Sequence, residues 1–130
     1  MTITELATLT GLSKHTLRYY ERLGLVPLVV RDSSSGHRRY SPSHVQWIDF
    51  LRSLRQTGMP LRDMQTYARL VAKGPSTWPA RRQLLAAHRA RVDQSIHLLR
   101  EHRQLLTRKL RSGCAPVGLG NPVHGPSPRE

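Results

Sequence analysis

The feature that most constrains this chain is a stretch of more than thirty residues, from Pro79 to about Arg111, without glycine or internal proline. Because glycine and proline end helices, the stretch predicts one helix much longer than the usual ~11–12 residues. Its apolar residues repeat every seven positions, at Leu85, Val92, Leu99 and Leu106, and four residues after these Ile96 and Leu110 alternate with Arg89 and Arg103.

This long helix carries one apolar stripe and therefore needs a partner. We expect the partner to be the same helix of a second chain, in a coiled-coil homodimer. The pattern does not distinguish a parallel from an antiparallel pair. Two seam arginines placed opposite each other would be unfavourable, however, and this favours an offset antiparallel pair. The predicted dimerisation residues are Leu85, Val92, Ile96, Leu99, Leu106 and Leu110.

The N-terminal residues predict two short helices joined by a tight turn. Thr2 begins a capping-box pattern that is completed by Glu5, and Gly11 ends the first helix. Ser13 is a typical N-cap for a second helix that begins at Lys14 and ends at about residue 22. Two short helices across a turn that contains glycine are the sequence form of a helix-turn-helix.

A hairpin and two further helices are predicted next. β-branched residues, the turn cluster 33–36 and a second extended piece at 37–40 indicate a small hairpin. Ser41 and Pro42 begin a third helix that Gly58 stops, and a fourth helix runs from about Pro60 to Gly74. A basic hairpin beside a helix-turn-helix is a wing.

These elements predict a mainly α-helical fold in three parts. A winged helix-turn-helix DNA-binding domain occupies residues 1–75, a coiled-coil dimerisation helix follows over 76–112, and a tail covers 113–130. Eight of the last eighteen residues are glycine or proline. Such a tail buries too little surface to offset its ordering entropy, and we expect it to be disordered.

The charge of the chain indicates its class of partner. Lysine and arginine total 21 against 8 acidic residues, a formal net charge of +13. This favours nucleic acid as the partner, with an anionic membrane surface as the weaker alternative. No apolar run approaches the ~20 residues of a membrane span, the N-terminus lacks the basic segment of a secretion signal, and the single cysteine excludes an internal disulfide. We expect a cytoplasmic protein without a membrane partner.

Candidate DNA-binding residues lie on the second helix and on the hairpin. Lys14, His15 and Arg18 project near the N-terminus of the second helix, where a recognition helix reads base edges and phosphates. The wing candidates are Arg31, Arg38 and Arg39. On the second helix, Thr16 is suited to a phosphate or a thymine methyl, and the hydroxyl of Tyr19 or Tyr20 to a phosphate. Taken alone, this helix also fits an ordinary solvated amphipathic helix.

Five short motifs follow one another within residues 2–72: TGLS at 10–13, LRYYE at 17–21, LGL at 23–25, GHRRY at 36–40 and RQTGMPL at 55–61. Together they resemble the mercury-resistance-regulator (MerR) family of bacterial transcription factors. The resemblance implies a winged helix-turn-helix followed by an antiparallel coiled-coil dimer. It also implies binding to a palindrome in the spacer of a promoter, with the DNA distorted so that RNA polymerase engages both promoter elements.

The resemblance assigns roles to individual residues. Arg18, Tyr20, Arg38 and Tyr40 match the DNA-contacting positions of the family, and Lys14 and His15 occupy its variable base-reading positions. The chain departs from the family pattern in the wing, where His37 replaces the usual aromatic residue and one residue is added.

What the protein senses is the least determined property. The chain is similar to the branch that responds to aldehydes and nitrosative stress, but Ser53 stands where many of its members have a cysteine. Cys114 is the only cysteine and follows the long helix. It could be a tail residue without a sensing role, a redox sensor, or one ligand of a zinc or copper site shared with His88, His97 and His102. We expect no metal site, no cofactor and no separate effector domain.

No catalytic constellation is present. The acidic residues are few and scattered, and no glycine-rich phosphate loop occurs. The sequence therefore predicts a dimeric transcriptional regulator that binds promoter DNA, and not an enzyme. The alternatives are an architectural or excisionase-like winged-helix protein, which generally lacks a long dimer helix, and a basic adaptor that binds RNA or an acidic protein.

Overall fold

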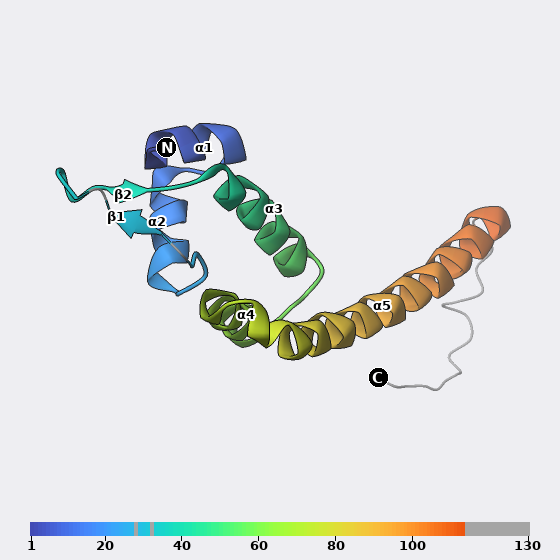
Figure 1. The fold of residues 1–130 in the computed structure, drawn as a ribbon. Helices are drawn as coiled ribbons and strands as arrows, with labels where there is room; N and C mark the ends of the chain where they lie inside the picture. The colour runs from blue at the N-terminus through green and yellow to red at the C-terminus, as the bar shows by residue number, and fades with distance from the viewer. Residues whose placement is uncertain (28, 32, 114–130) are drawn as a thin grey trace. The chain divides into compact units, whose positions relative to one another are not determined.

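The computed structural model describes residues 1–27, 29–31 and 33–113, and it is mainly helical as predicted (Figure 1). Its elements are α1 (Ile3–Thr10), α2 (Lys14–Arg22), β1 (Val30–Arg31), β2 (Arg38–Arg39), α3 (Pro42–Gln56), α4 (Leu61–Lys73), the short 3₁₀ helix η1 (Pro75–Thr77) and α5 (Trp78–Ser112). The chain divides into two compact units, Met1–Val92 and Asp93–Glu130. The predicted tail lies almost wholly outside the described residues.

The first two helices begin and end at the residues that the sequence indicates. The Thr2 hydroxyl accepts from the Glu5 backbone N–H at 3.2 Å, and the Glu5 carboxylate accepts from the Thr2 N–H at 2.7 Å. This reciprocal pair satisfies two donors at the start of α1. Ser13 caps α2 by accepting from the Thr16 N–H at 3.0 Å. These local bonds explain why two such short helices form.

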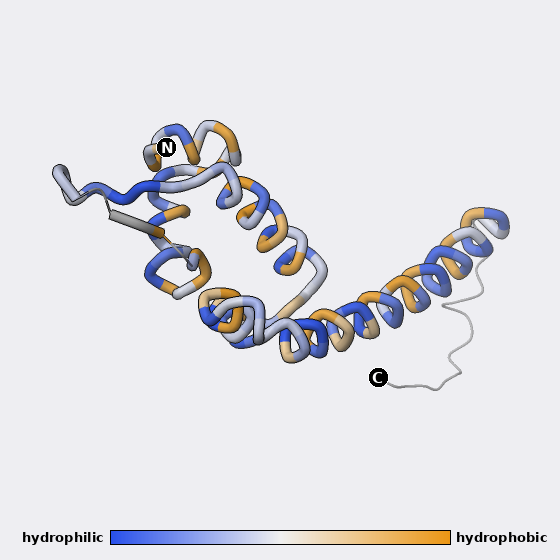
Figure 2. Tube along the Cα trace, viewed as in Figure 1, coloured by the Kyte–Doolittle hydropathy of each residue, from blue (hydrophilic) through white to orange (hydrophobic). Residues whose placement is uncertain are grey.

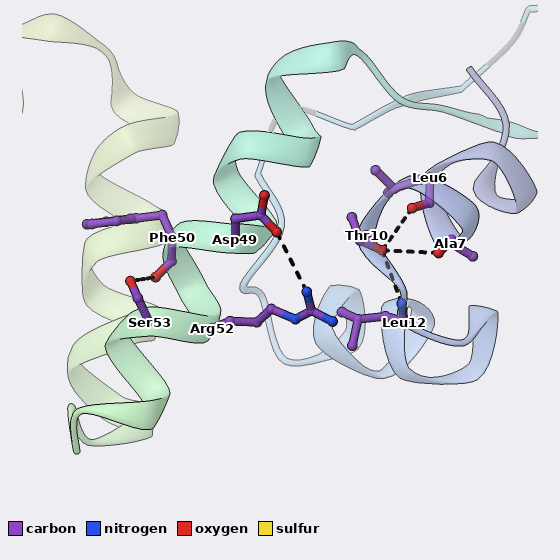
Figure 3. Close-up of polar contacts among 8 residues, drawn as sticks. All are labelled: Leu6, Ala7, Thr10, Leu12, Asp49, Phe50, Arg52 and Ser53. Carbon is purple, nitrogen blue, oxygen red and sulfur yellow. Dashed lines mark hydrogen bonds and ion pairs between the residues drawn. The ribbon is translucent and has the colours of Figure 1, made fainter.

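The turn between α1 and α2 is fixed by local hydrogen bonds and lies beside Arg52 of α3 (Figure 3). Gly11 has a φ of 76°, in the left-handed region that favours glycine. The buried Thr10 hydroxyl donates to the Leu6 carbonyl at 2.8 Å and accepts from the Leu12 N–H at 3.3 Å. From α3, Arg52 is paired with Asp49 at 3.6 Å, and its guanidinium lies 3.9 Å from where a Gly11 Cβ would sit. The turn is therefore held by its own local bonds, and the Arg52 side chain of α3 lies beside it.

The predicted hairpin is present as two short antiparallel strands. Val30 pairs with Arg39 and Arg31 with Arg38. Just after β2, the Tyr40 N–H donates to the Met1 carbonyl at 2.8 Å, and the N-terminal ammonium donates to the Tyr40 carbonyl at 2.6 Å. This exchange fixes the base of the hairpin beside the start of α1.

The core of the first unit is formed by α1, α2, α3 and the segment that precedes the hairpin. Its most deeply buried side chains are Leu6, Leu17, Leu25, Ile48 and Leu51. Figure 2 shows the apolar residues of these helices as orange segments and β2 as strongly hydrophilic. The helical periodicity read from the sequence thus corresponds to one buried face on each helix.

The first turns of α5 belong to the first unit and pack against its other elements. Leu85 contacts the core cluster, the His88 imidazole bonds the Thr57 hydroxyl at 2.7 Å, and Arg91 lies 3.8 Å from the Asp63 carboxylate. His88 is buried, which the sequence did not indicate. Within the described residues no helix is both long enough and apolar enough to cross a bilayer.

In the second unit the apolar side chains of α5 are exposed. Ile96, Leu99, Leu106 and Leu110 range from 40% to 82% exposed. The heptad pattern therefore has two parts: Leu85 packs within its own chain, and the residues after Val92 present an uncovered apolar stripe.

Candidate nucleic-acid interface

The exposed face of α2 carries three basic side chains near its N-terminus. Lys14, His15 and Arg18 are exposed, as the sequence predicts, while Leu17 on the opposite face is 2% exposed. Thr16 is partly buried, and its hydroxyl oxygen accepts from the Ser13 hydroxyl at 3.0 Å. The helix N-terminus adds partial positive charge at the same end, so this face is suited to an anionic backbone.

The two adjacent tyrosines of α2 have different environments. Tyr19 is 46% exposed, and the Arg22 guanidinium lies over its ring at 5.8 Å. Tyr20 is 8% exposed, and its hydroxyl accepts from the Arg55 guanidinium at 3.4 Å. Of the two hydroxyls proposed for phosphate contact, Tyr19 is therefore the accessible one. Tyr20 mainly builds the core.

One carboxylate joins the recognition helix to the wing. Glu21 accepts from the Tyr40 hydroxyl at 2.6 Å and also from the Arg38 guanidinium. Tyr40 is buried, and this burial, reinforced by the Glu21 carboxylate, raises the pKa of its hydroxyl well above the usual range. Tyr40 therefore stays protonated and acts as a donor to Glu21. In this position it orients the wing and has little surface for a direct contact.

A basic cleft of about 400 Å³ lies between the start of α1, the recognition helix and the wing. We define it by its basic lining residues, which are Lys14, Arg18, His37, Arg38 and Arg39. Arg31 contributes its backbone to β1 opposite Arg38. Four of the basic residues that the sequence singled out thus meet on one concave surface, although those of α2 and those of the wing are 20 to 25 positions apart in the sequence.

Sequence reasoning assigned no role to Glu21, although it is the residue that connects these segments. A signal was available: an acidic side chain in the last turn of a helix is opposed by the helix dipole. Its presence in an otherwise basic helix indicates a cationic or donor partner elsewhere. The identity of that partner, however, depends on the fold.

No group of three or more metal-ligating side chains occurs among the residues that the structure describes, a range that excludes Cys114. On the surface, the His97 Nε2 lies 3.4 Å from the Glu101 carboxylate, and the His88 Nε2 is hydrogen-bonded to the Thr57 hydroxyl. Ser53 is exposed, and its hydroxyl donates to the Phe50 carbonyl at 2.8 Å within α3 (Figure 3). These residues therefore offer no thiolate or shared ligand set.

Comparison with known proteins agrees with this geometry. Residues 1–70 match the family model described as MerR HTH family regulatory protein, and residues 45–109 match the model MerR, DNA binding. The HTH-type transcriptional regulator AdhR of Bacillus subtilis (strain 168) is 39% identical over 92 residues, which cover 71% of this chain and 65% of AdhR. The chain thus spans just under two thirds of that relative's length.

Two solved structures have the same fold. The crystal structure of HiNmlR, a MerR family regulator lacking the sensor domain and bound to promoter DNA, has a TM-score of 0.75 at 34% identity, covering 85% of this chain and 86% of HiNmlR. A putative MerR family transcriptional regulator from Listeria monocytogenes has a TM-score of 0.78 at 33% identity, covering 85% and 83%.

These matches confirm the resemblance that the five motifs indicated. The first family model covers more than half of the chain, including both helices of the helix-turn-helix and the wing. The family consists of transcriptional regulators and not of enzymes, in agreement with the lack of a catalytic constellation in the sequence. This chain belongs to the MerR family of helix-turn-helix regulatory proteins.

Proposed function

We propose that this DNA-binding regulator acts as a homodimer on a palindromic site within a promoter. The observation that carries the proposal is the basic cleft, where Lys14 and Arg18 of α2 face Arg38 of the wing. In this arrangement α2 enters the major groove and reads bases with Lys14, His15 and Arg18. Arg31, Arg38 and Arg39 hold the flanking phosphates.

The link through Glu21 supports this use of the wing. Because Glu21 binds both Arg38 and Tyr40, the wing and the recognition helix are positioned together before DNA arrives. Preorganisation of this kind reduces the ordering cost of binding. Tyr40 and Tyr20 contribute by holding the fold, and Tyr19 supplies an accessible hydroxyl.

The exposed stripe of α5 supports the homodimer. Ile96, Leu99, Leu106 and Leu110 form one face at helical spacing, with Val92 at its start. A second copy of this helix covers such a stripe with an identical one, and a two-fold dimer matches a palindrome. Leu85 was also predicted to lie in the dimer seam; its contacts with the core of its own chain assign it a role in joining α5 to the DNA-binding unit.

Distortion of the promoter and action on RNA polymerase follow the MerR resemblance. HiNmlR is bound to promoter DNA in its crystal structure, and the present chain covers 86% of it. Bending or untwisting a spacer costs several kcal/mol, on the order of 1–6, which backbone contacts must offset. The basic cleft supplies such contacts. A cytoplasmic location, on the bacterial nucleoid, is part of the same proposal.

A footprint on the DNA upstream of the chain's own gene tests the proposal. We expect a protected palindrome between the two promoter elements, with a hypersensitive centre that marks distorted base pairs, at about physiological salt. Arg18→Ala should weaken the footprint, so that protection requires a higher protein concentration, whereas Arg69→Ala, an exposed arginine of α4 outside the basic cleft, should preserve it. Diffuse protection that disappears as salt rises would instead indicate an architectural DNA binder.

A further inference from the structure

A second concave site lies on the other side of the recognition helix. It is a pocket of about 240 Å³ between the end of α2, the end of α3 and the start of α4. Its walls are mostly apolar, and we define this apolar pocket by Tyr19, Leu23, Met59, Leu61 and Met64, together with Tyr20 and Arg55. It shares no lining residue with the basic cleft.

The walls of this pocket are tied to one another. Gln65 of α4 donates to the Leu23 carbonyl at 2.8 Å, and the Met59 N–H donates to the Leu54 carbonyl at 2.9 Å. Met59 and Met64 are each 4% exposed, so the floor belongs to the core. Leu61 and Tyr19 are large apolar side chains left nearly half exposed at the mouth. The pocket is therefore preformed at its floor and open to solvent at its mouth.

Positive charge accompanies this apolar surface. Arg55 lines the pocket and donates to the Tyr20 hydroxyl, and Arg22 lies over the ring of Tyr19. Across the described part of the chain, neither guanidinium has a carboxylate oxygen within 4.0 Å. An apolar pocket that carries an arginine without a carboxylate partner is complementary to a ligand with an apolar body and one anionic end.

The volume limits the size of the ligand. An engineered cavity of about 150 Å³ accepts benzene, and pockets for drug-sized molecules begin at roughly 300 Å³. We propose that the apolar pocket binds a small aromatic or short-chain carboxylic acid, with its carboxylate on Arg55 and its apolar body between Met59, Leu61 and Met64. Such a ligand contacts α2 directly, through Tyr19 and Tyr20.

This site is independent of the proposed promoter function, because binding is measured without DNA. An effect of the ligand on operator affinity would rest on that function. The ligand contacts the helix that carries Lys14 and Arg18 and also α4, which precedes α5 in the chain. A ligand that orders these walls is thus placed to change the orientation of the recognition helix.

The test is a titration of the isotopically labelled full chain with phenylacetate, in which NMR measures the amide chemical shifts at each ligand concentration. We expect saturable shifts centred on Leu23, Met59 and Leu61, with a Kd of roughly 0.1–1 mM, which about ten non-hydrogen atoms can sustain. The neutral isostere phenylacetamide should bind about tenfold more weakly, because a charge-assisted contact with Arg55 is lost.

Matched variants separate this site from general anion binding. Arg55→Gln should weaken phenylacetate about tenfold and Leu61→Trp should block the mouth, whereas Arg62→Gln, an exposed neighbour outside the pocket, should change little. The proposal is overturned by equal binding of the acid and the amide, by inorganic phosphate binding as well as phenylacetate, by shifts centred on Lys14 and Arg38, or by no shift at 10 mM ligand. None of these outcomes bears on the footprint.

Discussion

The Tyr40 hydroxyl donates to the Glu21 carboxylate at 2.6 Å, and this bond connects the end of the wing to the end of the recognition helix. The two residues are 19 positions apart, and the partners of the bond are largely shielded from water. Hydrogen bonds to charged groups in such surroundings contribute more than those at the surface.

Tyr40→Phe should therefore destabilise the first unit. Removing a hydrogen bond to a carboxylate is expected to lower the free energy of unfolding by about 1.5–3 kcal/mol. Urea unfolding followed by circular dichroism measures this change. Tyr19→Phe is the matched control, because its ring is about half exposed, and it should stay within ~0.5 kcal/mol of the wild type. Equal effects of the two substitutions would show that the Glu21 bond does not hold the wing.

Arg18→Ala should remove sequence-specific binding while the chain stays dimeric. A base or phosphate contact on the recognition helix accounts for about 1–3 kcal/mol, so the affinity for the operator should fall by roughly 5- to 150-fold. Fluorescence anisotropy on operator and scrambled duplexes measures this loss, and sedimentation verifies the dimer. Full discrimination between the two duplexes by this variant would contradict the assignment of α2.

Lys14→Gln should reduce the salt dependence of binding. Each phosphate contact contributes about 0.9 to the slope of log K against log salt concentration on duplex DNA. If Lys14 contacts phosphate, the slope should decrease by about that amount. If it contacts a base, the slope should change less and the loss should depend on the operator sequence. Affinities measured between about 50 and 200 mM salt distinguish these two roles, and no change in either quantity would exclude Lys14 from the interface.

Leu99→Glu should convert the dimer to monomers in sedimentation equilibrium. Leu99 is 68% exposed in the middle of the apolar stripe, so a second copy would bury the new carboxylate without a partner. Leu98→Glu is the matched control. Leu98 is 53% exposed, but it lies about 100° around the helix and should remain at the edge of the pair. Monomers from both variants, or from neither, would place the seam elsewhere.

Folding stability should decrease as the pH falls below about 6.5, through His88. The Thr57 hydroxyl donates to the Ser53 carbonyl at 2.6 Å, so the His88 Nε2 is the donor in the bond with Thr57. Nδ1 is then a buried acceptor without a partner among the described residues. Burial, and next the charge of Arg91, lower the pKa of His88 from 6.5, while Asp63 raises it.

The sign follows from this depressed pKa. Above pH 6.5 the imidazole is neutral in both states; as the pH falls, the unfolded chain binds a proton that the folded chain resists, so the free energy of unfolding decreases. Urea unfolding between pH 8 and 5 should show this slope in the wild type and a smaller one in His88→Gln. His97→Gln, an exposed histidine of the same helix, should retain the wild-type slope. A wild-type slope in His88→Gln would refute the assignment.

The order and limits of the helices could be predicted from the sequence. Thr2, Gly11 and Ser13 act through bonds to residues within four positions, so their effect is visible in the chain itself. The helix predicted from residue 79 to about 111 begins at Trp78 and ends at Ser112. Helix caps, turn glycines and apolar periodicity are local properties, and they are sufficient where packing agrees with them.

The sequence could not show which candidate DNA-binding and dimerisation residues are accessible and which are buried. Tyr19 and Tyr20 are identical neighbours in sequence, yet the packing of α3 and α4 against α2 exposes the first ring and buries the second. Leu85 and Leu99 have the same heptad position, but Leu85 packs on the core of its own chain. A heptad specifies which face of a helix is apolar and leaves open what covers that face.

The sequence by itself determined the class of protein, the helix-turn-helix with its wing, the long helix and the basic character of the recognition surface. The tertiary structure decided the role of Glu21, the burial of Tyr40 and His88, and the pocket beside Arg55. The physical reason is the range of the interactions. The first set depends on residues within one or two helical turns, whereas each contact in the second set joins residues between 17 and 42 positions apart, which only the folded chain brings together.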